Sequence, residues 1–157
     1  MSQQTNKGTA LVTGSSSGIG AIYADRLARR GYDLILVARD KAKLDTLAAK
    51  LAKDTGRKVE VLAADLNAKT DLRRVEERLK SDPNITALVN NAGVGSAGPL
   101  LTSDVDQMDA MIQLNVVALT RLALAAAPAS FRALGVDGGS TGSAAGRTQP
   151  SQVAVSR

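Results

Sequence analysis

The stretch Thr13-Gly14-Ser15-Ser16-Ser17-Gly18-Ile19-Gly20 decides the fold. A short apolar run, residues 8–13, precedes it, and residues 19–30 after it carry apolar side chains at helical spacing. Strand, glycine-rich turn and helix in this order are typical of a phosphate-binding loop. In such a loop glycines let the backbone approach a pyrophosphate, and the positive end of the helix meets its charge. The alternative is a turn that only packs the helix on the strand.

Three further apolar segments of the chain predict buried strands, and amphipathic segments separate them. These strands are expected at residues 33–38, 58–63 and 85–89. Gly31 and Gly56 are expected to end the first two helices, and Asn67 and Ser103 to cap the later ones. Because strands alternate with helices, the sequence predicts an α/β fold with a doubly wound parallel sheet.

The C-terminal part of the chain changes character at residue 129. Residues 104–127 predict a long helix that is apolar on more than one face, which needs two partners: the sheet and, as a hypothesis, a second subunit. Beyond it, Ser, Gly and Ala supply 15 of the last 29 residues, and no apolar periodicity continues. We therefore predict an incomplete dinucleotide-binding domain over residues 1–128 and an irregular tail over residues 129–157.

The composition of the 157 residues excludes several classes of function. With no Cys and no His, the chain has no disulfide, thiolate nucleophile or imidazole base, and it lacks the usual ligands of zinc and copper. The net charge of +5 is spread over the helices and only three residues are aromatic, so no nucleic-acid surface is expected. The N-terminus lacks a signal-peptide core, and the most apolar stretch, residues 116–128, contains Arg121 and is too short for a bilayer. These features predict a cytoplasmic protein without membrane contact.

Polar residues follow the later strands, at the ends where open α/β sheets bind ligands. The second strand ends in Ala38-Arg39, so the acid that usually binds a ribose 2′-hydroxyl is absent and a guanidinium can bind a 2′-phosphate. We therefore predict NADP(H) over NAD(H), unless Arg39 is only a solvated side chain beside Asp40. Asp65 follows the third strand and can accept a hydrogen bond from an adenine amino group. Asn90 follows the fourth strand, where structural and ligand-binding roles are equally open.

Four motifs together resemble the short-chain dehydrogenase/reductase family. The glycine-rich loop resembles the family's cofactor loop, Asp65 its adenine-contacting acid, Asn90-Asn91-Ala92-Gly93 its sheet-stabilising motif, and Asn115 its catalytic-site asparagine. The resemblance covers residues 7 to about 128. It implies a Rossmann-type fold with the strand order 3-2-1-4, and hydride transfer between NAD(P)(H) and a small-molecule carbonyl or alcohol. The family often pairs subunits through the region that corresponds to residues 104–127. The cofactor-binding residues expected here are Gly14, Ser16, Ser17, Gly18, Ile19, Gly20, Arg39, Asp65, Leu66, Asn91, Ala92 and Gly93.

The family's proton-transfer residues have no clear counterpart in this sequence. The family's mechanism uses a Ser on the fifth strand and a Tyr-x-x-x-Lys on the following helix. Here the only tyrosines are Tyr23 and Tyr32, and the last lysine is Lys80. Ser143, in Ser-Ala-Ala-Gly, is the candidate for the serine, although no strand-like run precedes it. A chance serine in a Ser/Gly-rich tail is the alternative.

These departures leave three interpretations open. The chain is an oxidoreductase of this type that is inactive alone, a non-catalytic dinucleotide-binding or partner-binding module, or an unstable remnant. The abrupt change at Ala129 suggests a broken reading frame, a hypothesis that sequencing of the encoding DNA tests. Without later strands, the strand at residues 85–89 is expected to form an unpaired edge.

Overall fold

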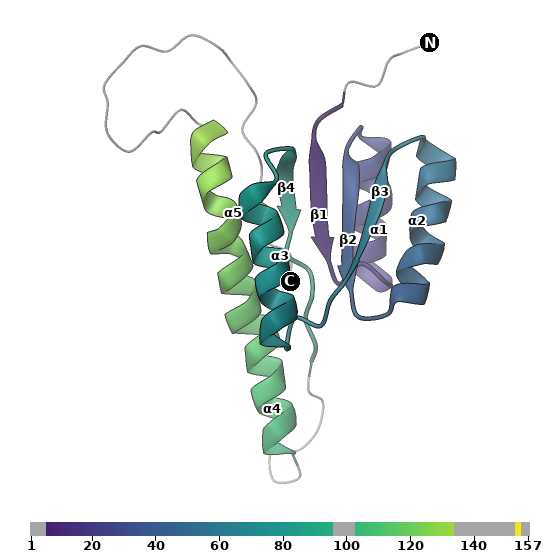
Figure 1. Cartoon of the computed structure of the whole chain (residues 1–157). Helices are drawn as coiled ribbons and strands as arrows, with labels where there is room; N and C mark the ends of the chain where they lie inside the picture. Colours follow the sequence, from purple (N-terminus) through teal and green to yellow (C-terminus); the bar gives the residue numbers. More distant parts are fainter. Residues whose placement is uncertain (1–5, 96–102, 134–152, 155–157) are drawn as a thin grey trace, which may run out of the picture.

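In the part of the chain that the structure describes, five parallel strands form one sheet in the order β3-β2-β1-β4-β5 (Figure 1). The computed structural model describes residues 6–95, 103–133 and 153–154 of the chain. The first four strands have the order 3-2-1-4 that the sequence resemblance implied. The strands are β1 (Thr9–Thr13), β2 (Asp33–Ala38), β3 (Val59–Ala63), β4 (Ile85–Val89) and β5 (Val153–Ala154).

Helices connect the strands and cover both faces of the sheet (Figure 1). The last three helical elements follow one another without a break and form one long rod beside β4. A π-helical segment, η2, interrupts this rod between two α-helices. The helices are α1 (Gly18–Arg29), α2 (Lys41–Thr55), α3 (Lys69–Ser81), α4 (Val105–Ile112), η2 (Gln113–Ala118) and α5 (Leu119–Ala133).

The core consists of two apolar layers, one on each face of the sheet. Successive side chains of a strand point to opposite faces, so Leu34 and Leu36 of β2 pack toward α1 and α2, while Ile35 and Val37 pack toward α3 and α5. All four of these β2 side chains are buried. The near-continuous apolar strands are therefore explained by helices on both faces, and the doubly wound α/β prediction is confirmed.

Small residues hold α1 against the sheet. The buried side of this helix is made of Gly20, Ala24 and Ala28, whereas Ile19 and Ile22 are 56% and 53% exposed. The helical spacing of the large apolar residues therefore predicted the helix, but it did not identify the small residues that the helix buries. Short side chains let the helix axis lie close to the strands, and the short loop after β1 places the start of α1 at the carboxyl edge of the sheet.

Glycines end the first two helices, as predicted. Gly31 (φ 99°) follows α1 and Gly56 (φ 69°) caps α2, both in the left-handed region that favours glycine. The two predicted N-caps are wrong. The helix α3 starts after Ala68 with no side-chain cap, because Asn67 lies in a turn in which its N–H donates to Asp65 Oδ1 (3.0 Å). The helix α4 is capped by Asp104 rather than Ser103, and the Asp104 carboxylate accepts from the N–H of Asp106 (2.9 Å).

Two expectations about the C-terminal part of the chain need correction. The helix α5 continues to Ala133, so the irregular tail does not begin at residue 129. The strand β4 is also not an unpaired edge, because Leu88 and Val89 pair with Val153 and Ala154 of β5. A strand of two residues is too short to leave a period-2 pattern in the sequence, so periodicity could not reveal it.

The helical rod extends well beyond the apolar stretch at residues 116–128. From Val105 to Ala127 it has 23 residues, and an 18-residue window within it has a mean hydropathy of 1.6, so by length and composition alone it is long enough to cross a membrane. The expectation that the most apolar stretch is too short is therefore wrong, because the helix continues unbroken through η2. In this structure Leu122 lies in the core against the sheet. The Arg121 guanidinium donates two hydrogen bonds to the carboxylate of the buried Glu76 of α3. Its Nε donates to Oε1, and its Nη2 donates to Oε2 (2.9 Å).

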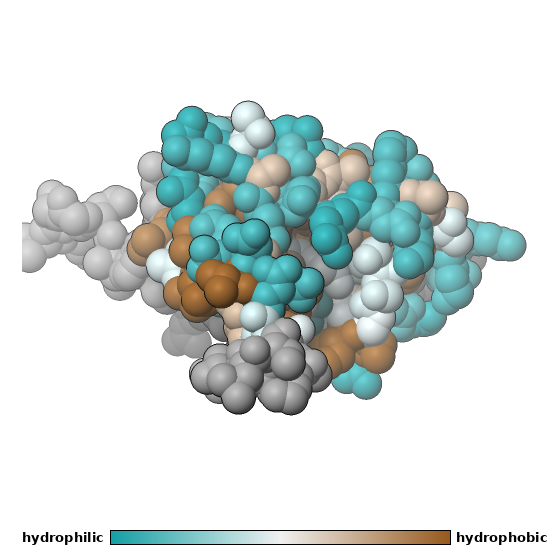
Figure 2. All heavy atoms as spheres, turned by 90° about the horizontal axis from the view of Figure 1, so that it is seen from below, coloured by the Kyte–Doolittle hydropathy of each residue, from teal (hydrophilic) through white to brown (hydrophobic). Residues whose placement is uncertain are grey.

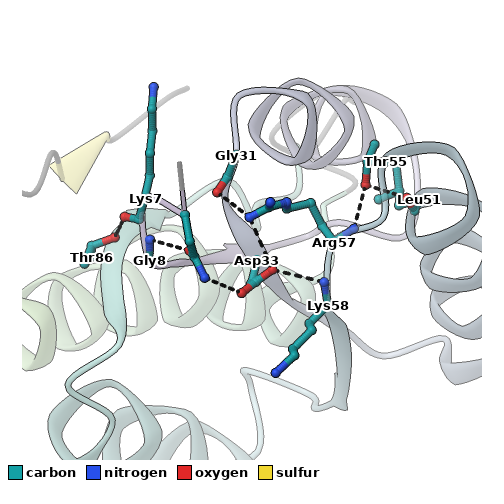
Figure 3. A network of polar contacts seen from close by, with 10 residues as sticks. Lys7, Gly8, Gly31, Asp33, Leu51, Thr55, Arg57, Lys58 and Thr86 are labelled. Carbon is teal, nitrogen blue, oxygen red and sulfur yellow. Dashed lines mark hydrogen bonds and ion pairs between the residues drawn. The ribbon is translucent and has the colours of Figure 1, made fainter. Parts of the chain in front are cut away.

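A polar network joins the amino ends of the strands, opposite the ends where the ligand was predicted (Figure 3). The Asp33 carboxylate accepts from the backbone N–H of Lys58 (3.0 Å) and from the amide of Asn6 (3.1 Å). Arg57 donates to the carbonyl of Gly31 (3.1 Å). These contacts connect β2 to the start of β3 and to the end of α1, so this edge of the sheet has a structural role.

Candidate functional site

A cleft of about 970 Å³ opens at the carboxyl ends of the strands, a volume in the range of small-molecule sites. Loops after β1, β2, β3 and β4 form its walls, and α4 and the start of η2 close one side. Figure 2 looks onto this edge, where most of the visible described surface is hydrophilic and hydrophobic side chains gather in separate patches. Eight predicted cofactor residues line the cleft: Gly14, Ser16, Ser17, Arg39, Asp65, Leu66, Ala92 and Gly93.

The glycine-rich loop lies where strand β1 meets helix α1, as the sequence predicted. Gly14 has φ 66°, and a Cβ there would lie 2.9 Å from the Cα of Ala92. A Cβ on Gly20 would lie 2.2 Å from the carbonyl oxygen of Gly14. Gly18, Ile19 and Gly20 form the first turn of α1 and are not among the described residues that line the cleft. Ser17 caps α1 without a side-chain hydrogen bond, and no acidic residue lies in the first turn, so this helix end suits an anion.

The hydroxyl of Thr13 joins the glycine-rich loop to the loop after β4. Thr13 is fully buried, and its Oγ1 accepts from the N–H groups of both Asn91 and Ala92 at 3.0 Å. The Asn91 amide donates back to the carbonyls of Thr13 and Gly14, each at 3.3 Å. Asn91 therefore supports the glycine-rich loop from behind and does not line the cleft. Asn90 is buried and donates to the carbonyl of Leu119 (2.8 Å), so the structure gives it a structural role.

Three charged residues form the corner of the cleft beyond β2. The Arg39 guanidinium is exposed, and among the described residues no hydrogen bond or ion pair holds it. Asp40 caps α2 and accepts from the N–H of Lys43 (3.1 Å). This hydrogen bond is the main cause that lowers the pKa of Asp40 below its ordinary value, with a further contribution from the Lys43 ammonium. Asp40 and Lys43 line the cleft although they were not predicted as site residues.

Asp65 and its neighbours form the floor of the cleft beyond β3. The N–H of Asp65 donates to the carboxylate of Asp71 (2.8 Å), and Asp65 Oδ1 accepts from the N–H of Asn67. Asn67 also lines the cleft, and its Oδ1 is buried without a hydrogen-bond partner among the described residues. Asn67 was expected only as a helix cap, so its place in this site is a finding of the structure.

Asn115 lies in the π-helical segment η2 and holds the loop after β4. Its Oδ1 accepts from the N–H of Val94 (3.0 Å), and its Nδ2 donates to the carbonyl of Val94 (2.7 Å). A Cβ on Gly93 would lie 3.1 Å from this Oδ1. The π segment adds a residue to the helical turn, and such segments often mark functional positions. Ser143, the candidate for the catalytic serine, lies outside the described residues.

Replacing Asn115 is expected to loosen the loop that follows β4. Asn115→Ala removes two hydrogen bonds of about 0.5–1.5 kcal/mol each, so amide exchange at Val94 should become about tenfold faster. Hydrogen–deuterium exchange of the peptide that contains residues 93–95 measures this. Gln113→Ala, in the same π segment, serves as the control, and equal exchange in the two variants would contradict the role given to Asn115.

Comparison with known proteins places the chain in a family. The sequence profile of the short chain dehydrogenases matches residues 8–150, so the match continues beyond the residue-128 limit of the sequence resemblance. The chain belongs to the short-chain dehydrogenase/reductase family, whose members are oxidoreductases with a Rossmann-type fold.

Individual relatives support the same assignment. The chain is 51% identical to a short-chain dehydrogenase from Sphingobium yanoikuyae solved with NADPH, with a TM-score of 0.78 over 80% of this chain and 49% of that one. It is 48% identical to a bulky-bulky ketone specific alcohol dehydrogenase from Comamonas testosteroni, with a TM-score of 0.77 over 79% of this chain and 50% of that one. It is 35% identical to a very-long-chain 3-oxoacyl-CoA reductase from Vanderwaltozyma polyspora over 78% of this chain and 36% of that protein. The chain thus spans about a third to a half of the length of these relatives.

Proposed function

We propose that this chain binds a nicotinamide dinucleotide, with NADP(H) preferred over NAD(H), as the cofactor-binding part of a carbonyl or alcohol oxidoreductase. The observation that carries the preference is the Arg39 guanidinium, which is exposed in the cleft and has no partner among the described residues. A guanidinium can bind a phosphate with two parallel hydrogen bonds. The Sphingobium yanoikuyae relative was solved with NADPH, which supports the same choice.

The residues of the cleft fit a dinucleotide. Gly14 and Gly20 leave space that a Cβ would fill, so the backbone of the loop can approach a pyrophosphate. The start of α1, capped by Ser17 without a side-chain bond, would meet the pyrophosphate charge. Asp65 and the backbone of Leu66 would bind the adenine, and Arg39 the 2′-phosphate. When bound, the cofactor supplies or accepts the hydride.

The reaction of the whole protein belongs to the same proposal. Relatives named for ketone-specific alcohol dehydrogenation and for 3-oxoacyl-CoA reduction suggest a carbonyl or alcohol substrate. Asn115 would hold the loop after β4 in position beside the reacting groups. The sequence contains no Tyr-x-x-x-Lys, and proton transfer to the substrate oxygen needs a positioned acid or base. We therefore expect the 157-residue chain to bind cofactor without measurable turnover.

Binding measurements with the two reduced cofactors test the proposal. Because the chain has no Trp, the fluorescence of NADPH or NADH can be followed without energy transfer from tryptophan. Arg39→Gln should weaken NADPH binding about tenfold or more, since a hydrogen bond to a charged group is worth about 1.5–3 kcal/mol, and should leave NADH binding nearly unchanged.

Arg73→Gln is the control for this experiment, because Arg73 is exposed on α3 and is not among the residues that line the cleft. Equal affinity of the parent chain for NADH and NADPH would contradict the preference. Failure to bind either cofactor by a chain that unfolds cooperatively would favour the non-catalytic partner-binding alternative. A chain without a cooperative melt would favour the unstable remnant.

The helical rod supports two further parts of the proposal. Its exposed apolar side chains, Val105, Ile112, Val116, Val117 and Leu124, suit pairing with a second subunit. The Arg121–Glu76 pair and the burial of Leu122 favour packing on the sheet over insertion into a bilayer. Subunit pairing, the absence of membrane contact and a cytoplasmic location remain predictions.

A further inference from the structure

The corner of the cleft beyond β2 holds a second cation besides Arg39. Lys43 lies in the first turn of α2 and lines the same cleft as Arg39 and Asp40. Its Nζ is 3.4 Å from Asp40 Oδ2, and the two side chains are 65% and 45% exposed. An ion pair this exposed contributes little to stability. The ammonium is therefore available to a ligand of higher negative charge than a single carboxylate.

We propose that Lys43 is a second determinant of cofactor choice, which leaves Asp40 and binds the 2′-phosphate of NADP(H) together with Arg39. The inference rests on the proposed cofactor function. A ribose phosphate carries up to two negative charges and three acceptor oxygens, so it competes well with one carboxylate for the ammonium. While no cofactor is bound, the Asp40 carboxylate, which caps α2, pairs with the Lys43 ammonium at the cleft. It would oppose the phosphate once the cofactor is bound.

This arrangement gives the three residues different effects on affinity. Lys43 and Arg39 should favour NADPH and have little influence on NADH, which has no phosphate at this position. Asp40 should disfavour NADPH, because its carboxylate pairs with Lys43, one of the two cations that the phosphate needs. The sequence alone identified Arg39 as a cofactor-binding residue, since it follows β2 directly. Lys43 could be assigned only when the direction of α2 was known.

The same helical turn offers a matched control. Lys41 precedes Lys43 by two residues and carries the same charge, but it pairs with Asp45 (2.6 Å) and is not among the described residues that line the cleft. Residues two apart on a helix do not share a face. Lys41→Gln therefore changes the net charge as Lys43→Gln does, without touching the cleft.

Dissociation constants for NADPH and NADH, measured on the 157-residue chain and its variants, test the inference. Lys43→Gln should raise the Kd of NADPH about three- to tenfold and change that of NADH less than about twofold. Lys41→Gln should change neither constant by more than about twofold. Asp40→Asn keeps a side chain that can cap α2 but removes its charge, so it should lower the Kd of NADPH about two- to fivefold.

The outcomes separate this inference from the proposed function. If the parent chain prefers NADPH and Arg39→Gln removes the preference, but Lys43→Gln behaves like Lys41→Gln, the role of Lys43 is refuted and the proposed function stands. Equal weakening of NADPH and NADH by Lys43→Gln would also refute it, because a 2′-phosphate contact cannot affect NADH. If the parent chain binds neither cofactor, the proposed function itself is wrong.

Discussion

Thr13→Val should lower the free energy of unfolding by about 3 kcal/mol, because it removes the acceptor of two half-buried backbone N–H groups. The hydroxyl of Thr13 accepts from the N–H groups of Asn91 and Ala92, and no water can replace it easily at a fully buried position. Val is close to Thr in shape and favours strands at least as well, so neither a cavity nor strand propensity accounts for the loss. Urea unfolding followed by circular dichroism measures the effect.

Thr13→Ser is the matched control for this prediction. It keeps the hydroxyl and loses one methyl group, which costs about 1 kcal/mol at a buried site. If Thr13→Val proved as stable as Thr13→Ser, the hydroxyl would not be what holds the loop after β4. The larger loss in Thr13→Val should be accompanied by weaker NADPH binding, because Ala92 and Gly93 line the cleft.

Gly20→Ala should destabilise the chain by at least about 2 kcal/mol and weaken NADPH binding at least about tenfold. Ala is the better helix former by about 1 kcal/mol, so helix propensity alone predicts the opposite sign. The added Cβ would lie 2.2 Å from the Gly14 carbonyl oxygen and 2.7 Å from the Asn91 amide nitrogen. Because the Gly14 oxygen belongs to the backbone, the glycine-rich loop itself must move.

Gly95→Ala controls for the loss of a glycine at the cleft. A Cβ on Gly95 would meet no atom of the described residues within 4 Å, and its backbone is not in the left-handed region. We expect this variant to retain both stability and affinity. Should Gly20→Ala unfold at the same urea concentration as Gly95→Ala, the close approach of α1 to the glycine-rich loop would be contradicted.

The sequence predicts the elements of this fold well because each leaves a strong local pattern. The apolar run of β2 and the glycines after α1 and α2 depend on residues that are neighbours in the chain. The cleft at the carboxyl edge follows from the parallel order of the strands, which is why Gly14, Arg39 and Asp65 could be assigned to it in advance.

The parts that sequence reasoning missed depend on contacts between distant residues or on patterns too weak to recognise. Lys43 and Asn67 line the cleft because of the directions in which α2 and the turn after β3 leave the sheet. The π segment around Asn115 has no recognised composition of its own. The small buried residues of α1 were overlooked because Ile19 and Ile22 carry the apolar signal on this helix although their side chains are exposed.

The short side chains on the buried side of α1 determine how this region responds to mutation. Ala24 and Ala28 are fully buried, yet an alanine scan passes over both positions because they are already alanine. Substitution of Ala24 or Ala28 by a larger residue would instead be informative, because it would push α1 away from β1 and β2 and displace the N-terminal turn of the helix. The depth of the cleft thus depends on small side chains at Ala24 and Ala28, although neither residue lines the cleft.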